Sequence, residues 1–172
     1  MLSSDGSLFD ACTQILTREY GPLDFESEIS PWNKTDYYRD EMGDHIERKF
    51  IFFEQLVDPG DLPQIKIFTN SVESSFAAQV GSVLRRRINL DPGYVTQAKV
   101  VLATTKDFAH RIYLGDGIYA EVTLRYSNAD RGFVPFDYTY PDYRTEIYRL
   151  LFIKARENLR MTLKENGKTD LQ

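Results

Sequence analysis

The chain has 172 residues and a formal net charge of −5, with one cysteine and two histidines. This length fits one domain that is stable without disulfides or metals, and a lone cysteine with two histidines is too few for a usual zinc site. No apolar run approaches the roughly 20 residues that cross a bilayer, so we expect a soluble, cytoplasmic protein, and no cofactor is indicated.

The charge is unevenly distributed along the chain. Residues 1–60 contain 13 acidic and 5 basic residues, whereas residues 61–172 contain 13 and 16. An acidic net charge argues against a dedicated duplex-DNA binder, because displacing counterions requires a dense cationic surface. It also makes single-stranded RNA binding on the sheet face the least favoured alternative, so we do not expect a nucleic-acid partner. A local site for a small anion remains compatible with this distribution.

The first half predicts two helices and several strands. Apolar residues at helical spacing predict a helix that begins at Ser7 and ends before Gly21. Alternating residues 23–29 predict a strand with one acidic face. An apolar run within residues 47–56 predicts a central strand, and steps of three and four over 62–76 predict a second helix.

The remaining elements complete the predicted fold. Residues 85–90 read as a short strand, and with Met1 and Leu2 as a first strand the half would have ferredoxin-like β-α-β-β-α-β order. Residues 99–103 predict a strand, 111–126 a hairpin turning at Asp116-Gly117, and 147–163 a long helix. We therefore predict a single α+β domain over residues 1–172. It has an antiparallel sheet with a ferredoxin-like first half, helices packed on the sheet, and a long C-terminal helix.

A nine-residue segment occurs twice. Asp58-Pro59-Gly60, with Gln64 and Lys66, returns 33 residues later as Asp91-Pro92-Gly93, with Gln97 and Lys99. One interpretation is a pair of similar strand exits that bring both lysines to one cleft. The other is ordinary turn residues, matched by chance or by decayed duplication. A helix after the first copy and a strand after the second would mean that the repeat is not structural.

Two segments have the composition of a binding site. Residues 104–111 gather hydroxyls, cations and His110 at the end of a predicted strand, which suits a phosphate but is also common in solvated loops. Residues 133–143 form an aromatic loop, either a wall for a flat ligand or an apolar loop packed under the last helix.

The leading hypothesis is a module that binds a small anionic, phosphate-bearing ligand in a basic and aromatic cleft. If the protein is an enzyme, His110 is the candidate acid or base, with Asp91, Asp107 or Glu121 orienting it or accepting the proton. The predicted ligand-binding residues are Arg87, Asp91, Tyr94, Lys99, Lys106, Arg111, Tyr138, Tyr140 and Arg144. The alternative is a protein-interaction or homodimerisation module without a small-molecule site.

Several motifs together resemble a bacterial family of unknown function, domain-of-unknown-function family 4416. The motifs are Arg87–Tyr94, Thr104–Asp107, His110–Leu114, Gly117–Val122, Tyr140–Arg144, Asp36–Tyr38, Glu41–Gly43, Arg48–Phe50 and Phe68–Asn70. The resemblance covers almost the entire chain. Some members are labelled GTP-binding proteins, but this chain lacks both the glycine-rich phosphate loop and an Asn-Lys-x-Asp motif. The resemblance therefore implies a family and not an activity.

Overall fold

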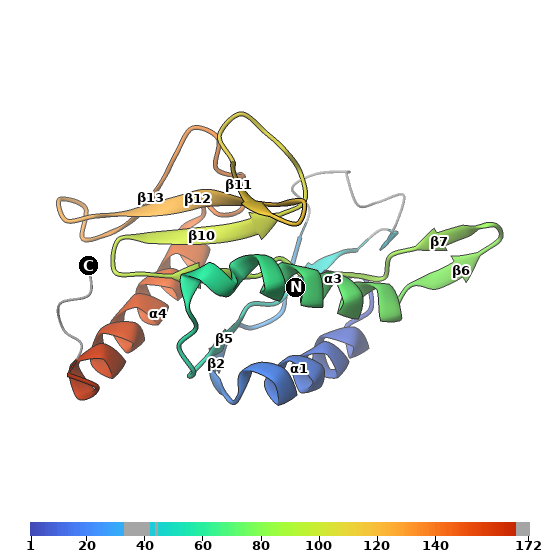
Figure 1. The fold of residues 1–172 in the computed structure, drawn as a ribbon, viewed down its shortest axis with the longest axis horizontal. Coiled ribbons are helices and arrows are strands. Elements are labelled where there is room, and N and C mark those ends of the chain that lie inside the picture. Colours follow the sequence, from blue (N-terminus) through green and yellow to red (C-terminus); the bar gives the residue numbers. More distant parts are fainter. Residues whose placement is uncertain (33–41, 44, 168–172) are drawn as a thin grey trace. The chain divides into compact units, whose positions relative to one another are not determined.

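The computed structural model describes residues 1–32, 42–43 and 45–167. The chain divides into two compact units, Met1–Asp91 and Pro92–Gln172, and both combine helical structure with antiparallel strands (Figure 1). This confirms the predicted α+β class. The Asp36–Tyr38 motif and the start of the Glu41–Gly43 motif lie outside the described residues.

Both predicted helices of the first unit are present. Helix α1 spans Ser7–Tyr20 and buries Leu8, Phe9, Cys12 and Leu16. Helix α3 spans Leu62–Ser75 after a short 3-10 turn, η1, at Pro59–Asp61. The Asp58 side chain accepts a hydrogen bond from the Gly60 amide at 2.8 Å, so the first Asp-Pro-Gly copy starts a helix.

The first unit contains a sheet of four short strands. These are β1 (Leu2–Ser3), β3 (Ser30–Pro31), β4 (Glu47–Arg48) and β8 (Ile88–Asn89), in the order β3-β4-β1-β8. The strand at Leu2–Ser3 supplies the predicted first strand and pairs antiparallel with both β4 and β8. Among the described residues, the first half therefore runs from strand β1 through helix α1, four strands and helix α3 to three further strands, so the predicted strand ahead of the first helix is present.

The predicted single strand over residues 47–56 is wrong. Its start, β4, pairs with β1 and β3, whereas β5 (Ile51–Phe53) pairs with β2 (Leu23–Glu26) in a separate two-stranded sheet. The strand breaks at Lys49, which is buried and forms an ion pair with Glu26 at 3.0 Å. The apolar run reflects ring stacking, because Phe52 stacks on Phe25 with ring centroids 4.3 Å apart.

The predicted strand at residues 85–90 is also divided. Strands β6 (Ala78–Val80) and β7 (Val83–Arg85) form a hairpin that turns at Gly81, where φ is 62°. Strand β8 begins only at Ile88 and joins the four-stranded sheet. The Arg85–Arg87 triplet thus connects two sheets.

The second unit contains a five-stranded antiparallel sheet. Its strands are β9 (Gly93–Val95), β10 (Lys99–Thr104), β11 (Ile112–Gly115), β12 (Ile118–Ser127) and β13 (Gly132–Pro135). Strand β12 pairs with β10 along one edge, and β11 and β13 pair with its two ends. The β11–β12 hairpin turns at Asp116 and Gly117, whose φ values of 52° and 75° confirm the predicted turn.

The long terminal helix, α4, spans Glu146–Glu165 and packs on β13 and β9 (Figure 1). Its buried residues are Tyr148, Phe152, Ala155 and Arg156. Among the described residues, no helix is both long and apolar enough to cross a membrane.

Candidate functional site

The best-connected group of predicted site residues lies in the second unit around Glu121. This residue is in the middle of β12, directly opposite Leu102 of β10, and only 4% of it is exposed. A buried carboxylate in a sheet requires compensating charge and hydrogen bonds. The segment that precedes β11 provides both.

Two side chains converge on one oxygen of Glu121. Nε2 of His110 lies 3.0 Å from Glu121 Oε2, and Nε and the terminal nitrogen of Arg111 each lie 2.9 Å from the same atom. The Arg111 side chain is 4% exposed and also donates to the Lys106 carbonyl oxygen at 3.0 Å. The Arg111 guanidinium therefore neutralises Glu121 and ties the loop before β11 to β12.

An aromatic stack covers the histidine. The His110 ring is stacked on Tyr138, with centroids 4.3 Å apart and planes 14° apart, and Tyr138 is stacked on Phe136 at 5.1 Å. Phe108 lies beside the group, with its ring 4.4 Å from the Arg111 guanidinium. We call His110, Arg111, Glu121, Phe136 and Tyr138 the His110 site.

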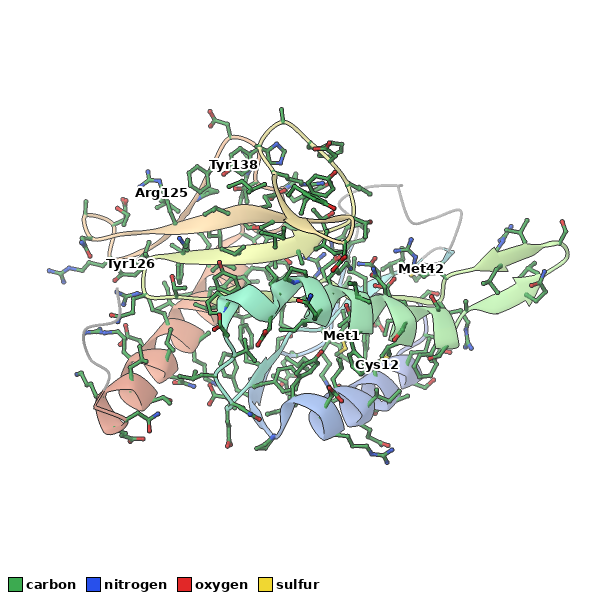
Figure 2. All side chains as sticks on the ribbon, in the orientation of Figure 1. Met1, Cys12, Met42, Arg125, Tyr126 and Tyr138 are labelled. Atoms are coloured by element: carbon green, nitrogen blue, oxygen red, sulfur yellow. The ribbon has the colours of Figure 1, made fainter. Side chains whose placement is uncertain are left out.

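The loop that carries Tyr138, which is labelled in Figure 2, is attached to β12 by side-chain hydrogen bonds. The Tyr138 hydroxyl donates to the Val122 carbonyl oxygen at 3.0 Å, and the Thr139 hydroxyl donates to that of Thr123 at 2.7 Å. Burial and the charge of Glu121 raise the pKa of Tyr138, so the phenol keeps the proton that it donates. These bonds fix the aromatic wall relative to Glu121.

The contacts of His110 define what the site can do chemically. Because a carboxylate only accepts hydrogen bonds, Nε2 carries the hydrogen that points to Glu121, and Nδ1 faces elsewhere. Among the described residues, His110 makes no other hydrogen bond, and its side chain is 27% exposed. Nδ1 is thus available to accept a proton, or to donate one once the ring is protonated.

Three other predicted site residues of this unit are Arg144, Asp107 and Tyr140, which lie near the aromatic loop or the β11–β12 hairpin. Within the described part of the chain, none of them has a recorded contact with His110. The Arg144 guanidinium donates to the carbonyl oxygens of Thr139 and Asp137 and so stabilises the aromatic loop. Asp107 lies beside the Tyr119 phenol, whose pKa is raised by burial and then by Asp107. Tyr140 follows the aromatic stack and is 42% exposed.

Tyr94 and Lys99 belong to the neighbouring strands of the same sheet. Tyr94 pairs with Val101 across β9 and β10, and burial raises the pKa of the Tyr94 phenol. Lys99 is exposed at the start of β10, opposite Arg125. No recorded contact among the described residues joins either of them to His110.

The last two predicted residues, Arg87 and Asp91, lie in the first unit. Arg87 forms an ion pair with Asp5 at 2.6 Å, and Asp91 accepts a hydrogen bond from the Asn89 amide at 2.6 Å. A single cleft that contains all of the predicted residues therefore remains a prediction. The structure unites His110, Arg111, Glu121 and Tyr138, with Lys106 contributing its backbone.

Sequence reasoning missed a buried polar network on α3. Lys66 and Glu73 are 4% and 7% exposed, and their charged groups lie 3.7 Å apart. Both fall on the apolar face of the helix, with Leu62 and Val72, and this position was a signal that they are buried. Phe108 was also overlooked, because a single aromatic residue in a polar loop carries no pattern.

Within the described residues, no group of three or more potential metal ligands comes together. The fold and the site define an α+β protein with a carboxylate-oriented histidine. Residues 1–159 match the family described as a domain of unknown function, DUF4416, and the chain belongs to this family. No curated protein and no solved structure matches the chain.

Proposed function

We propose that the protein binds a small anionic, phosphate-bearing ligand at the His110 site. The observation that carries this proposal is the arrangement of His110 itself. Its Nε2 is held by Glu121, its ring is stacked on Tyr138, and its Nδ1 edge has no hydrogen bond within the described residues. A polar atom that is oriented but not used inside the protein is typical of a ligand contact.

The charges around the ring suit an anion. Glu121 is neutralised by the permanently charged Arg111, so protonation of His110 gives the site a net positive charge at the exposed ring. A protonated Nδ1–H donates a charge-assisted hydrogen bond to a phosphate oxygen. Arg111 acts through Glu121, since its recorded contacts are with Glu121, Phe108 and the Lys106 carbonyl.

Turnover would be an extension of binding. In that case His110 is the proton-transferring group, and Glu121 is a positioning residue that fixes the orientation of the ring. Asp107 is a weaker candidate for this orienting role, because its recorded neighbour is Tyr119.

A thermal-shift and calorimetric screen with inorganic phosphate, pyrophosphate and sugar and nucleoside phosphates tests the proposal. We expect at least one compound to stabilise the wild type and His110→Ala to lose about 1.5 to 3 kcal/mol of binding free energy. His45→Asn is the matched control, because His45 is exposed, lies in the first unit and has a φ of 64° that asparagine tolerates. Failure of every compound to stabilise the wild type, or full binding by His110→Ala, would overturn the assignment.

Two further variants show how far the site extends. Arg87→Ala and Lys99→Ala remove predicted cations whose recorded contacts do not include His110. If both variants bind as the wild type does, the ligand contacts only the His110 site. A loss with either variant would extend the site to that residue.

A second candidate function is association with another protein chain. Helix α4 supports it, because Ile147, Leu150 and Met161 are 71%, 55% and 57% exposed. Large apolar side chains clustered on one exposed face mark interaction surfaces. Light scattering over a range of protein concentrations tests this candidate independently of any ligand, and a monomer at every concentration would remove it.

A further inference from the structure

The exposed face of α4 has the spacing of a helix-pairing surface. Its exposed residues occur alternately three and four positions apart: Ile147, Leu150, Lys154, Glu157, Met161 and Lys164. This spacing is the repeat by which two helices pack along their length. The opposite face carries the buried Tyr148, Phe152 and Ala155. The helix therefore carries a second row of exposed side chains, three of them apolar and three charged, opposite its buried face.

We propose that this surface, which we call the outer α4 face, pairs antiparallel with the same face of a second copy of the chain. The inference develops the second candidate function and is independent of the His110 site. With the two-fold axis between Lys154 and Glu157, Leu150 lies opposite Met161 of the second copy. Lys154 then lies opposite Glu157 of that copy, and Ile147 lies against the aliphatic stem of Lys164.

Charge complementarity identifies the second copy as the occupant. The antiparallel arrangement places Lys154 against Glu157 twice, once on each side of the axis. A parallel arrangement would place Lys154 against Lys154 and Glu157 against Glu157, and such like-charge contacts oppose association. The face is thus complementary to itself in one direction only.

The Glu157 carboxylate is already positioned for this contact. It accepts hydrogen bonds from Arg156 at 3.2 Å and from Arg160 at 3.3 Å, and its side chain is still 50% exposed. Fixing the carboxylate on its own helix lowers the entropy that is lost when a second helix arrives. The exposed part remains free for Lys154 of the second copy.

The size of the surface determines the strength of the dimer. A 20-residue helix is about 30 Å long, so one helix pair buries less than the roughly 1,200 Å² of a standard stable interface. We therefore expect a weak dimer whose fraction increases with protein concentration. Sedimentation velocity over a dilution series should show this shift.

Cysteine cross-linking tests the register. Leu150→Cys mixed with Met161→Cys should give a disulfide-linked dimer under mild oxidation, because these positions face each other across the axis. Each variant alone should remain uncross-linked, since its two cysteines would lie about 16 Å apart along the helices. The natural Cys12 is fully buried, so the wild type is the background control.

Charge exchange tests the ion pairs. Lys154→Glu and Glu157→Lys should each reduce the dimer fraction, and the double variant should restore it. Cross-linking by Leu150→Cys alone would indicate a parallel pair and overturn the proposal. It would also be overturned by a wild type that stays monomeric at every concentration. His110→Ala should dimerise as the wild type does, so a failed ligand screen and a failed dimer are distinguishable.

Discussion

The ammonium of Lys66 lies 3.6 Å from the Asp91 carboxylate, so a residue of the first Asp-Pro-Gly segment is paired with one of the second. Lys66 also donates to the Leu90 carbonyl oxygen at 2.7 Å, and Glu73 accepts from the Leu90 amide at 2.7 Å. Burial raises the pKa of Asp91, but Lys66 and other neighbouring charges lower it by more, and the net pKa is lowered. Two side chains of α3 thus form hydrogen bonds with both backbone groups of Leu90, the residue that follows β8.

Replacing Lys66 with methionine should destabilise the first unit by up to about 3 to 5 kcal/mol, because the buried Glu73 would lose the nearby Lys66 ammonium and keep only Arg86, at 3.5 Å, as its counter-charge. Burial already raises the pKa of Glu73, which shows how poorly this position tolerates an uncompensated charge. Urea denaturation measures the change in unfolding free energy. Lys99→Met, at an exposed position, should change it by about 0.5 kcal/mol or less.

The double variant Lys66→Met/Glu73→Gln should be more stable than the sum of the single losses predicts. The glutamine oxygen can still accept from the Leu90 amide, and the buried charge of Glu73 is removed together with that of Lys66. If the free-energy losses of the two single variants simply add in the double variant, the pairing with Glu73 is not the reason that Lys66 stabilises the first unit.

Gly93→Ala should destabilise the second unit by about 1 to 3 kcal/mol or more. A Cβ at this position would overlap the Val101 carbonyl oxygen and lie 2.7 Å from Cδ2 of Leu102, so β9 and β10 would have to separate. Gly132→Ala is the control, because its Cβ would meet Ile153 at 3.5 Å, an ordinary contact. Thermal unfolding of the two variants checks the difference, and equal losses would contradict the close approach of β9 to β10.

Arg111→Met should cost about 3 to 5 kcal/mol of stability, because it leaves Glu121 buried without its permanent counter-charge. His110→Ala should cost only about 1 kcal/mol, since the ring is partly exposed and Glu121 keeps its Arg111 contacts. Chemical denaturation of both variants separates structural from ligand-binding roles. If His110→Ala is as destabilising as Arg111→Met, the histidine is a structural residue.

Stability should decrease as the pH rises from about 9 to 11 because of Cys12 (Figure 2). Burial raises the pKa of this thiol from 9.0 to about 11, so over this range the unfolded state loses the proton first and is favoured. The stabilisation that comes from keeping this thiol protonated is fully present below pH 9. It amounts to at most about 3 kcal/mol, at 1.36 kcal/mol per unit of pKa shift.

The pH dependence of Cys12→Ala is the reference, because its remaining groups titrate as in the wild type. The difference in unfolding free energy between the two proteins should shrink with rising pH. In the native protein at pH 8, thiol reagents should modify Cys12 only as fast as the protein opens. Rapid modification without denaturant would contradict its burial.

The helices were predictable because each has one continuous apolar face, as from Leu8 to Leu16 in α1. The strand over residues 47–56 was not, since its aromatic residues stack on one another and the chain changes sheets at Lys49. The spacing of apolar residues predicts long elements with one buried face. Two-residue strands such as β4 are instead determined by pairing with distant segments, which the spacing does not show.

The core of the site was predictable because its residues are close in sequence. The β11–β12 hairpin folds Arg111 back onto Glu121, and the chemical type of each residue already indicates a site. The charge of Arg144 suggests a ligand contact, but two backbone carbonyl oxygens accept hydrogen bonds from its guanidinium. Whether a cation faces a ligand or a carbonyl depends on loop geometry, which composition does not encode.

The strand pairing also has a consequence for the order of folding. In the second unit, β9 pairs with β10, β11 with β12, and β12 with β13, so most of its sheet forms between consecutive segments. In the first unit, Leu2 must find Arg48 and Asn89 before its sheet exists. Because contacts between distant segments slow folding, the second unit should acquire protected amides first after dilution from denaturant, and the first only when β8 joins β1.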